Sequence, residues 1–266
     1  MLKCLEGQGH VYALDVDPIE IVKTKKRLAD KGYGPEILTV IQQNFGNVAE
    51  VGAEYGPFDF MLADLGVSSM QIDNPDRGFS FKFDGPLDLR LNPEKGVSAA
   101  ERLKDITSAE LEGMLIENSD EPYATEITRG MMHAIRKGKG IETTTDLREI
   151  IEKALQFLPE DTRKETIKKS CQRTFQALRI DVNSEFEVLE SFLESLPDVL
   201  APGGRIAMLT FHSGEDRLVK KAFKQFYREG IFSAIANDVI RPSAEECNMN
   251  GRARCTKMRW AIKASE

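Results

Sequence analysis

The sequence predicts an α/β fold built on a parallel sheet, interrupted by an inserted helical domain. Short apolar segments alternate with amphipathic ones over the first 65 residues, and this alternation resumes after residue 183. Charged helical patterns fill residues 98–172. We therefore expect a core made of residues 1–97 and 173–266, with residues 98–172 as the insertion. A chain of 266 residues is long enough for one large domain with an insertion, or for two domains.

The first part of the chain alternates strands and helices. Pro18 favours a helix start directly after an apolar β-rich segment. We expect strands over residues 10–17, 37–40 and 58–65, separated by helices over residues 18–29 and 48–55. Such an order is typical of a parallel sheet.

The middle of the chain begins with a loop and continues with helices. Residues 66–96 are rich in Ser, Asp, Pro and Gly, and a loop this long is usually functional or disordered. Helix starts are expected at Thr107, Glu121 and Thr145, and breaks near residues 138–140 and at Pro159.

The last part returns to the α/β alternation. We expect a helix over residues 183–200, a turn at residues 202–204, a strand over 205–211 and a helix over 215–228. Residues 252–263 alternate basic residues with Met258, Trp260 and Ile262, which predicts a last strand with a basic outer face.

Composition limits the possible functions. A net charge of −7 and a pI near 5.3 argue against a protein coated in positive charge, although a local basic face remains possible. The four cysteines and three histidines show no spacing typical of zinc or of a disulfide framework, so we expect no metal and a reducing, cytoplasmic location. The apolar runs are too short to span a membrane, and no signal peptide is expected.

Two acids end the first predicted strand. The carboxyl edge of an open α/β sheet is its usual ligand crevice, where a carboxylate can bind both hydroxyls of a ribose. Asp15 is the candidate for that role, whereas Asp17 is expected to cap the helix that begins at Pro18. An acid of this kind serves dinucleotides and S-adenosylmethionine alike.

Asp64 ends the third predicted strand and begins the octet DLGVSSMQ. At this position an acceptor could bind the N–H groups of an amine, favour a pyramidal nitrogen and orient its lone pair for methyl transfer. Alternatively, Asp64 satisfies backbone amides of the following loop.

Aromatic and basic residues alternate over residues 76–90, where we expect three phenylalanines on one side of an extended chain. Aromatic rings beside cations can stack an unpaired base and hold phosphate, although phenylalanines at this spacing more often belong to a core. The better RNA candidates are Arg77, Lys82 and Arg90.

The segment FHSGEDR, residues 211–217, follows a predicted strand and contains His212 beside Ser213. A G-x-S-x-G nucleophile elbow is absent, so Ser213 is expected to cap the next helix. On that helix Lys220 and Lys224 either face RNA or form a solvated surface.

Five strings carry a resemblance that covers nearly the whole chain: DLGVSSMQID, RGFSFKFDGPLDLR, RTFQALRIDVNSE, APGGRIAMLTFHSGEDRLVK and GRARCTKMR. In order and approximate spacing they resemble the bacterial 16S rRNA cytosine-N4 methyltransferases. The resemblance implies a Rossmann-like methyltransferase sheet with an inserted helical domain, S-adenosyl-L-methionine as the methyl donor, and 16S rRNA in the small ribosomal subunit as partner. By matching position, the cofactor contacts would be Asp15, Phe45, Asp64 and Gln71. Arg252 and Arg254, in the last string, are further RNA-binding candidates.

Two departures from the family pattern lead to structural expectations. Family members begin with a strand and a glycine-rich loop ahead of the strand that carries Asp15. Here the first strand and glycine-rich loop are expected to be missing, which would leave a gap at the centre of the sheet. Gly214 stands where the family usually has Leu, so local packing is expected to differ.

Three functions therefore compete. The first is a methyltransferase that captures a cytidine above Asp64. The second is a noncatalytic protein that binds RNA or the ribosome, because the glycine loop that would hold the cofactor is absent. The third is a nicotinamide oxidoreductase, against which the lack of a G-x-G-x-x-G motif counts. The target nucleotide, any general base and the possible formation of a homodimer stay open.

Overall fold

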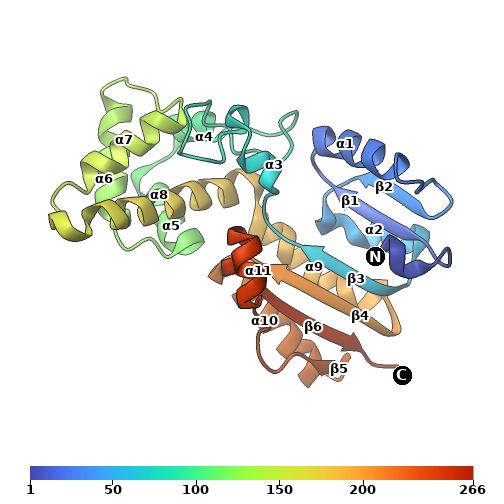
Figure 1. Cartoon of the computed structure of the whole chain (residues 1–266). Coiled ribbons are helices and arrows are strands. Elements are labelled where there is room, and N and C mark those ends of the chain that lie inside the picture. The colour runs from blue at the N-terminus through green and yellow to red at the C-terminus, as the bar shows by residue number, and fades with distance from the viewer. Residues whose placement is uncertain (266) are drawn as a thin grey trace. The chain divides into compact units, whose positions relative to one another are not determined.

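The computed structural model describes residues 1–265 and divides into two compact units (Figure 1). Unit 1 contains Met1–Gly66 and Phe186–Glu266, and unit 2 contains Val67–Glu185. Each unit has its own hydrophobic core. The expected α/β class with a helical insertion is confirmed.

Unit 1 begins with a pair of parallel strands. β1 (Val11–Asp15) and β2 (Leu38–Gln42) are joined by α1 (Pro18–Ala29) and pair from Val11 opposite Leu38 to Asp15 opposite Gln42. The side chain of Asp17 accepts the N–H groups of Ile19 and Glu20, which confirms its predicted role as the helix cap.

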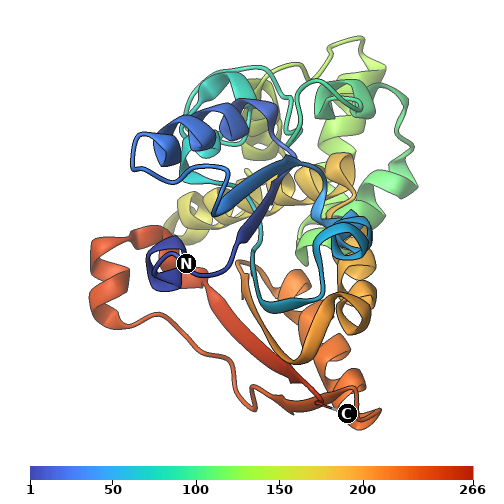
Figure 2. The same cartoon turned by 90° about the vertical axis from the view of Figure 1, so that its right-hand side faces the viewer.

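The second sheet of unit 1 has the strand order β3-β4-β6-β5 (Figure 2). β3 and β4 are parallel, whereas β6 is antiparallel to both of its neighbours. Apolar residues of α9 and α10 bury one face of this sheet, with Ile206 and Met208 of β4 fully buried beneath them. The bounds of these elements are α2 (Val48–Tyr55), β3 (Phe58–Asp64), α9 (Glu185–Val199), β4 (Leu200–Thr210), α10 (Ser213–Arg228), β5 (Phe232–Ile235) and β6 (Lys257–Lys263).

One edge of β1 and one edge of β3 are unpaired among the described strands. Side chains meet there instead: the Tyr12 ring lies 4.5 Å from the ring of Tyr55 and 5.9 Å from that of Phe58, between centroids. On β3 itself, Phe60 and Leu62 are 47% and 46% exposed. The described strands therefore form two separate sheets, β1-β2 and β3-β4-β6-β5.

The basic residues of β6 do not form an outer face. Arg259 is 8% exposed and pairs with Asp216, and the Lys263 Nζ donates to the carbonyls of Pro197 and Leu200. Trp260, like the other apolar residues alternating with these cations, is only half-buried. The predicted orientation was wrong because Asp216 and free carbonyls, which lie far away in the sequence, attract the cations to the covered face.

Unit 2 is helical around a separate core that includes Leu111, Leu115, Ile127, Leu147 and Leu178. Its predicted helix starts are correct to within about three residues, and Pro159 immediately precedes the last helix. The helices are α3 (Ser69–Ile72), α4 (Ala99–Asp105), α5 (Ser108–Ser119), α6 (Ala124–Arg136), α7 (Thr144–Ala154) and α8 (Glu160–Asn183).

Unit 2 extends beyond the predicted insertion of residues 98–172 at both ends. The segment before it is ordered and packed, because Leu87 and Leu89 are each 1% exposed within the unit 2 core. After it, α8 continues without a break to Asn183. The boundaries of unit 2 are therefore set by two buried leucines at its start and by the continuous helix α8 at its end. The change in composition along the sequence did not reveal these boundaries.

Short elements complete the chain: η1 (Leu2–Leu5), η2 (Phe45–Asn47), η3 (Pro75–Arg77), α11 (Ala244–Met249) and η4 (Gly251–Cys255). Because η4 occupies the start of the predicted last strand, β6 begins only at Lys257. The predicted turn at residues 202–204 lies within an irregular part of β4, where Gly203 has a φ of +72°. No helix in the described part of the chain is long and apolar enough to cross a membrane.

A buried ion pair between α10 and β6 stabilises unit 1. Asp216 accepts from Arg259 Nε at 2.7 Å and from Lys257 Nζ at 3.2 Å. Burial alone would raise the pKa of Asp216, but the hydrogen bonds from Arg259 and Lys257 outweigh burial and lower it. Because the folded-state pKa is depressed, this stabilisation is present above the pKa of the unfolded state and is lost as the pH falls through the folded-state pKa.

We predict that Asp216→Asn lowers the free energy of unfolding of unit 1 by about 3 kcal/mol at pH 7, since it leaves the Arg259 charge buried and unpaired. Urea denaturation followed by circular dichroism measures this change. The free energy of unfolding of the variant should also fall less steeply as the pH is lowered, because the titration of Asp216 is removed. As a control, Asp238→Asn removes an exposed acid of the same unit and should change stability by less than about 0.5 kcal/mol. Equal stability of the two variants would contradict the assignment.

Candidate cofactor and substrate site

Asp15 lies at the carboxyl end of β1, on the surface. Its Oδ1 accepts the N–H of Asp17 at 2.9 Å, and the backbone of Val16 also interacts with the carboxylate. Burial is the main factor that raises the pKa of Asp15; the N–H of Asp17 lowers it and the negative charge of Asp17 raises it further. The backbone therefore orients this carboxylate at the end of β1.

Phe45 follows β2 in a tight turn that packs on α9. The side chain of Asn44 accepts the N–H of Gly46 at 3.0 Å, and the Phe45 ring lies edge-on to Phe192 at 5.3 Å between centroids. A Cβ added to Gly46 would lie 3.2 Å from Val188. Packing against α9 therefore holds this turn in place, with the Phe45 ring half-buried.

Asp64 is the last residue of β3, and the next residue, Leu65, donates its N–H to the carbonyl of Leu209. The chain then turns at Gly66, which has a φ of +83°. The Asp64 residue is exposed, yet partial burial of its carboxyl group raises the pKa, and the charge of Glu215 raises it further. The raised pKa makes Asp64 a better proton acceptor than an isolated aspartate.

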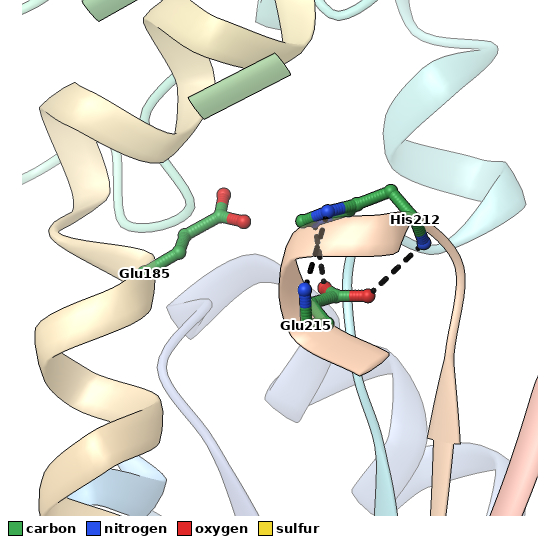
Figure 3. A group of neighbouring side chains, drawn as sticks. All are labelled: Glu185, His212 and Glu215. Atoms are coloured by element: carbon green, nitrogen blue, oxygen red, sulfur yellow. Dashed lines mark hydrogen bonds and ion pairs between the residues drawn. The ribbon is translucent and has the colours of Figure 1, made fainter. Parts of the chain in front are cut away.

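Glu215 is a residue that the sequence analysis missed, and it lies at the start of α10 beside His212 (Figure 3). It is 3% exposed, and its Oε2 accepts the N–H of Phe211 at 2.8 Å. Its Oε1 lies 3.2 Å from His212 Nε2. The helix cap is therefore His212, in a capping box with Glu215, and the expectation that Ser213 caps the helix was wrong by one residue. The acid three positions after His212 was the signal in the sequence.

Figure 3 also draws Glu185. Within unit 2, its carboxylate accepts from Arg179 Nε at 2.7 Å and from Arg179 Nη2 at 2.9 Å. This bidentate ion pair is half-buried and stabilises the end of α8.

Gln71 lies in α3 of unit 2 and is 6% exposed. Its Oε1 accepts the N–H of Ser68 at 2.8 Å, and its own N–H donates to Ser68 Oγ at 3.2 Å. The two residues form a capping box, so Gln71 fixes the start of α3. Its proposed contact with a cofactor stays a prediction.

Two of the RNA candidates have structural partners inside unit 2. Arg77 is 5% exposed, donates to the carbonyls of Arg90 and Leu91, and lies over the Phe79 ring. Arg90 binds both carboxylate oxygens of Asp88 and the carbonyl of Gly96. These contacts count against both arginines as RNA ligands, because their guanidinium groups already hold the loop that contains them.

Five further RNA candidates are exposed: Lys82, Lys220, Lys224, Arg252 and Arg254. The phenylalanines near Lys82 are not on one side of an extended chain, because the backbone turns at residues 81–83. Phe79 and Phe81 pack against the unit 2 core, whereas Phe83 is 57% exposed. The core interpretation is therefore correct for two of the three rings.

The sequence matches the MraW methylase family over residues 1–264. A protein of Lachnoclostridium phytofermentans named ribosomal RNA small subunit methyltransferase H 1 is 71% identical over 99% of this chain and 72% of its own length. A protein of Agathobacter rectalis with the same name is 67% identical over 99% of this chain and 76% of its own. The chain belongs to the MraW methylase family. It is therefore a methyltransferase, and the methyl donor of this family is S-adenosyl-L-methionine.

The residues at the end of β1 fit the nucleoside part of this donor. Asp15 presents a surface carboxylate that the backbone orients. A ribose offers two hydroxyl donors to such a group. The oxidoreductase alternative is set aside because the chain belongs to a methylase family.

Packing explains why residue 214 is a glycine in this chain. It is buried at the start of α10, and a Cβ built on it would lie 2.5 Å from Phe186 Cζ. The Phe186 ring also lies beside His212, 5.9 Å between ring centroids. Gly214 therefore leaves space for Phe186, which explains why a residue other than Leu is found here.

We predict that Gly214→Leu destabilises unit 1 by about 2 kcal/mol through overpacking against Phe186. Combining it with Phe186→Ala should cost less than the sum of the single changes, with a coupling of about 1 kcal/mol measured by urea denaturation. Gly113→Leu is the matched control, because open space surrounds Gly113 in α5. Additive effects of Gly214→Leu and Phe186→Ala would show that the ring does not limit this position.

Proposed function

We propose that the chain transfers a methyl group from S-adenosyl-L-methionine to the N4 amine of a cytidine in 16S rRNA. The observation that carries this proposal is the pair of acids at the carboxyl ends of β1 and β3 in a member of a methylase family. The names of the relatives, small-subunit rRNA methyltransferases, support the choice of substrate. On the basis of that substrate alone, we also propose the small ribosomal subunit as partner and a cytoplasmic location.

Asp15 and Asp64 have different roles in this proposal. Asp15 would hold the ribose of the donor through its carboxylate, and the donor would supply a methyl group on a positively charged sulfur. Asp64 accepts an N–H of the cytosine amine and so turns the nitrogen lone pair toward that methyl. The N–C bond forms as the S–C bond breaks, and the methylated amine then loses a proton to water. Asp64 thus orients and stabilises the amine, and no strong base is needed.

Glu215 is a positioning residue for Asp64. Backbone N–H groups of Phe211 and His212 fix its carboxylate, and its negative charge raises the pKa of Asp64. A higher pKa strengthens Asp64 as a hydrogen-bond acceptor toward the amine as positive charge develops on the nitrogen.

The alternative to this activity was a noncatalytic role in RNA or ribosome binding. The match to a methylase family over residues 1–264 and the names of the relatives count against it. The two functions differ in one measurable property, which is binding of S-adenosyl-L-methionine.

We predict that titration calorimetry detects binding of S-adenosyl-L-methionine to the chain. Asp15→Ala should weaken this binding by about tenfold or more, because hydrogen bonds to a charged group are lost. Asp64→Asn should leave this affinity within about threefold and lower kcat about 100-fold, by analogy with removal of one oriented polar group. Tritium transfer to unmethylated small subunits measures kcat.

Asp59→Asn is the matched control, because Asp59 is an exposed acid in the same strand but away from its carboxyl end. It should change neither affinity nor kcat. Binding of small-subunit RNA without binding of the methyl donor would instead establish the noncatalytic role.

A further inference from the structure

Unit 2 contains a cavity of about 510 Å³ between α7 and α8. Arg148 of α7 lines one side, and Arg163, Lys164 and Lys168 of α8 line the other. Residues four apart share a face of a helix, so Lys164 and Lys168 lie on the same side of α8. The cavity lies within a single unit and contains none of the residues proposed above for methyl transfer.

Positive charge predominates around this cavity. Four cations line it against two acids, Glu152 and Glu160, in a chain with a net charge of −7. Arg163 donates through Nε and Nη2 to the carbonyl of Leu158, so it serves the fold. Lys164 and Lys168 are exposed, and neither forms an ion pair with any residue that the structure describes. Two lysine charges therefore remain for a ligand.

Arg148 contributes a donor that the fold does not satisfy. Its Nη1 donates to the carbonyl of Phe81 at 3.3 Å, whereas its buried Nε has no hydrogen-bond partner among residues 1–265. Glu152 Oε1 lies 3.5 Å from this nitrogen and forms an ion pair with Arg148. An oxygen of a bound anion would supply the hydrogen bond that the Nε lacks.

The remaining walls are neutral. Cys171 is 1% exposed, and burial raises the pKa of its thiol to about 12, so the thiol stays protonated at neutral pH. Phe81 packs on Phe175 at 5.7 Å between ring centroids and provides an apolar wall. No negative charge thus comes from the thiol, and an aromatic ring lies beside the cations.

We propose that this cavity binds a backbone phosphate of single-stranded RNA, with Arg148, Lys164 and Lys168 around the phosphate and Phe81 against the adjoining nucleoside. Cations next to an aromatic ring are the combination that binds unpaired RNA without sequence preference. The inference deepens the proposed function and rests on it, because it assumes an RNA substrate. It adds an RNA contact in Val67–Glu185 that is independent of the methyl donor.

Fluorescence anisotropy of a labelled decauridylate, measured between 50 and 250 mM KCl, tests the proposal with the full chain. The double variant Lys164→Glu, Lys168→Glu should bind at least about tenfold more weakly at low salt, and its log–log salt slope should be shallower by about 1.4, for two lost phosphate contacts. The neutral pair Lys164→Gln, Lys168→Gln should show the same change in slope.

The matched control is Lys95→Glu, Lys137→Glu, which makes the same change in charge at exposed lysines of unit 2 outside the cavity. It should alter affinity by less than about threefold, as expected for screened charges. Equal weakening by both glutamate pairs, or no weakening by either, would overturn the proposal. Displacement of the probe by uridine monophosphate at an equal phosphate concentration would assign the cavity to a free nucleotide and also overturn it.

Calorimetry with S-adenosyl-L-methionine separates this test from that of the proposed function. The variants at Lys164 and Lys168 should bind the methyl donor as the unchanged chain does, because these residues belong to unit 2 and Asp15 belongs to unit 1. Loss of probe binding with donor binding intact supports the cavity as an RNA site. A chain that binds the probe through this cavity but never binds the donor would contradict only the methyl-transfer proposal.

Discussion

The hydrogen-bonded ladder between the parallel strands β3 and β4 is the constraint on which the candidate site depends. In this ladder Asp64 lies opposite Leu209. The next residue, Leu65, donates its N–H to the carbonyl of Leu209. Since β4 leads directly into α10, this pairing brings the end of β3 close to Glu215. Two acids far apart in the sequence thereby interact, and the mutual repulsion is tolerated because backbone N–H groups hold the Glu215 carboxylate.

The other edge of β3 is not paired with any of the described strands. Strands β1 and β3 each leave backbone groups unpaired on one side among the described strands, and Phe60 and Leu62 remain exposed on β3. Aromatic contacts of Tyr12 link the two sheets in place of backbone hydrogen bonds. Unpaired apolar edges favour addition of another strand.

Local signals predicted the regular elements well. The bounds of α1 and α2 match the sequence prediction. For α1, a proline start and a capping acid lie next to each other in the sequence. Partners distant in the sequence explain what local patterns missed. Arg77, an RNA candidate in the sequence analysis, donates to carbonyls 13 and 14 residues later, and no short pattern reveals these partners. In the same way Asp216 reverses the expected orientation of Arg259.

The internal partners of these cations matter for how an acidic chain can act on RNA. Many of its cations are committed to the fold: Arg77 and Arg90 order a loop, Arg259 balances a buried acid, and Lys263 satisfies free carbonyls. A count of Lys and Arg therefore overstates the charge available to a phosphate backbone. Since only uncommitted cations release counterions from RNA on binding, their placement matters more than the net charge. The cavity proposed as an RNA site has this character, because Lys164 and Lys168 are exposed and form no ion pair with any residue that the structure describes.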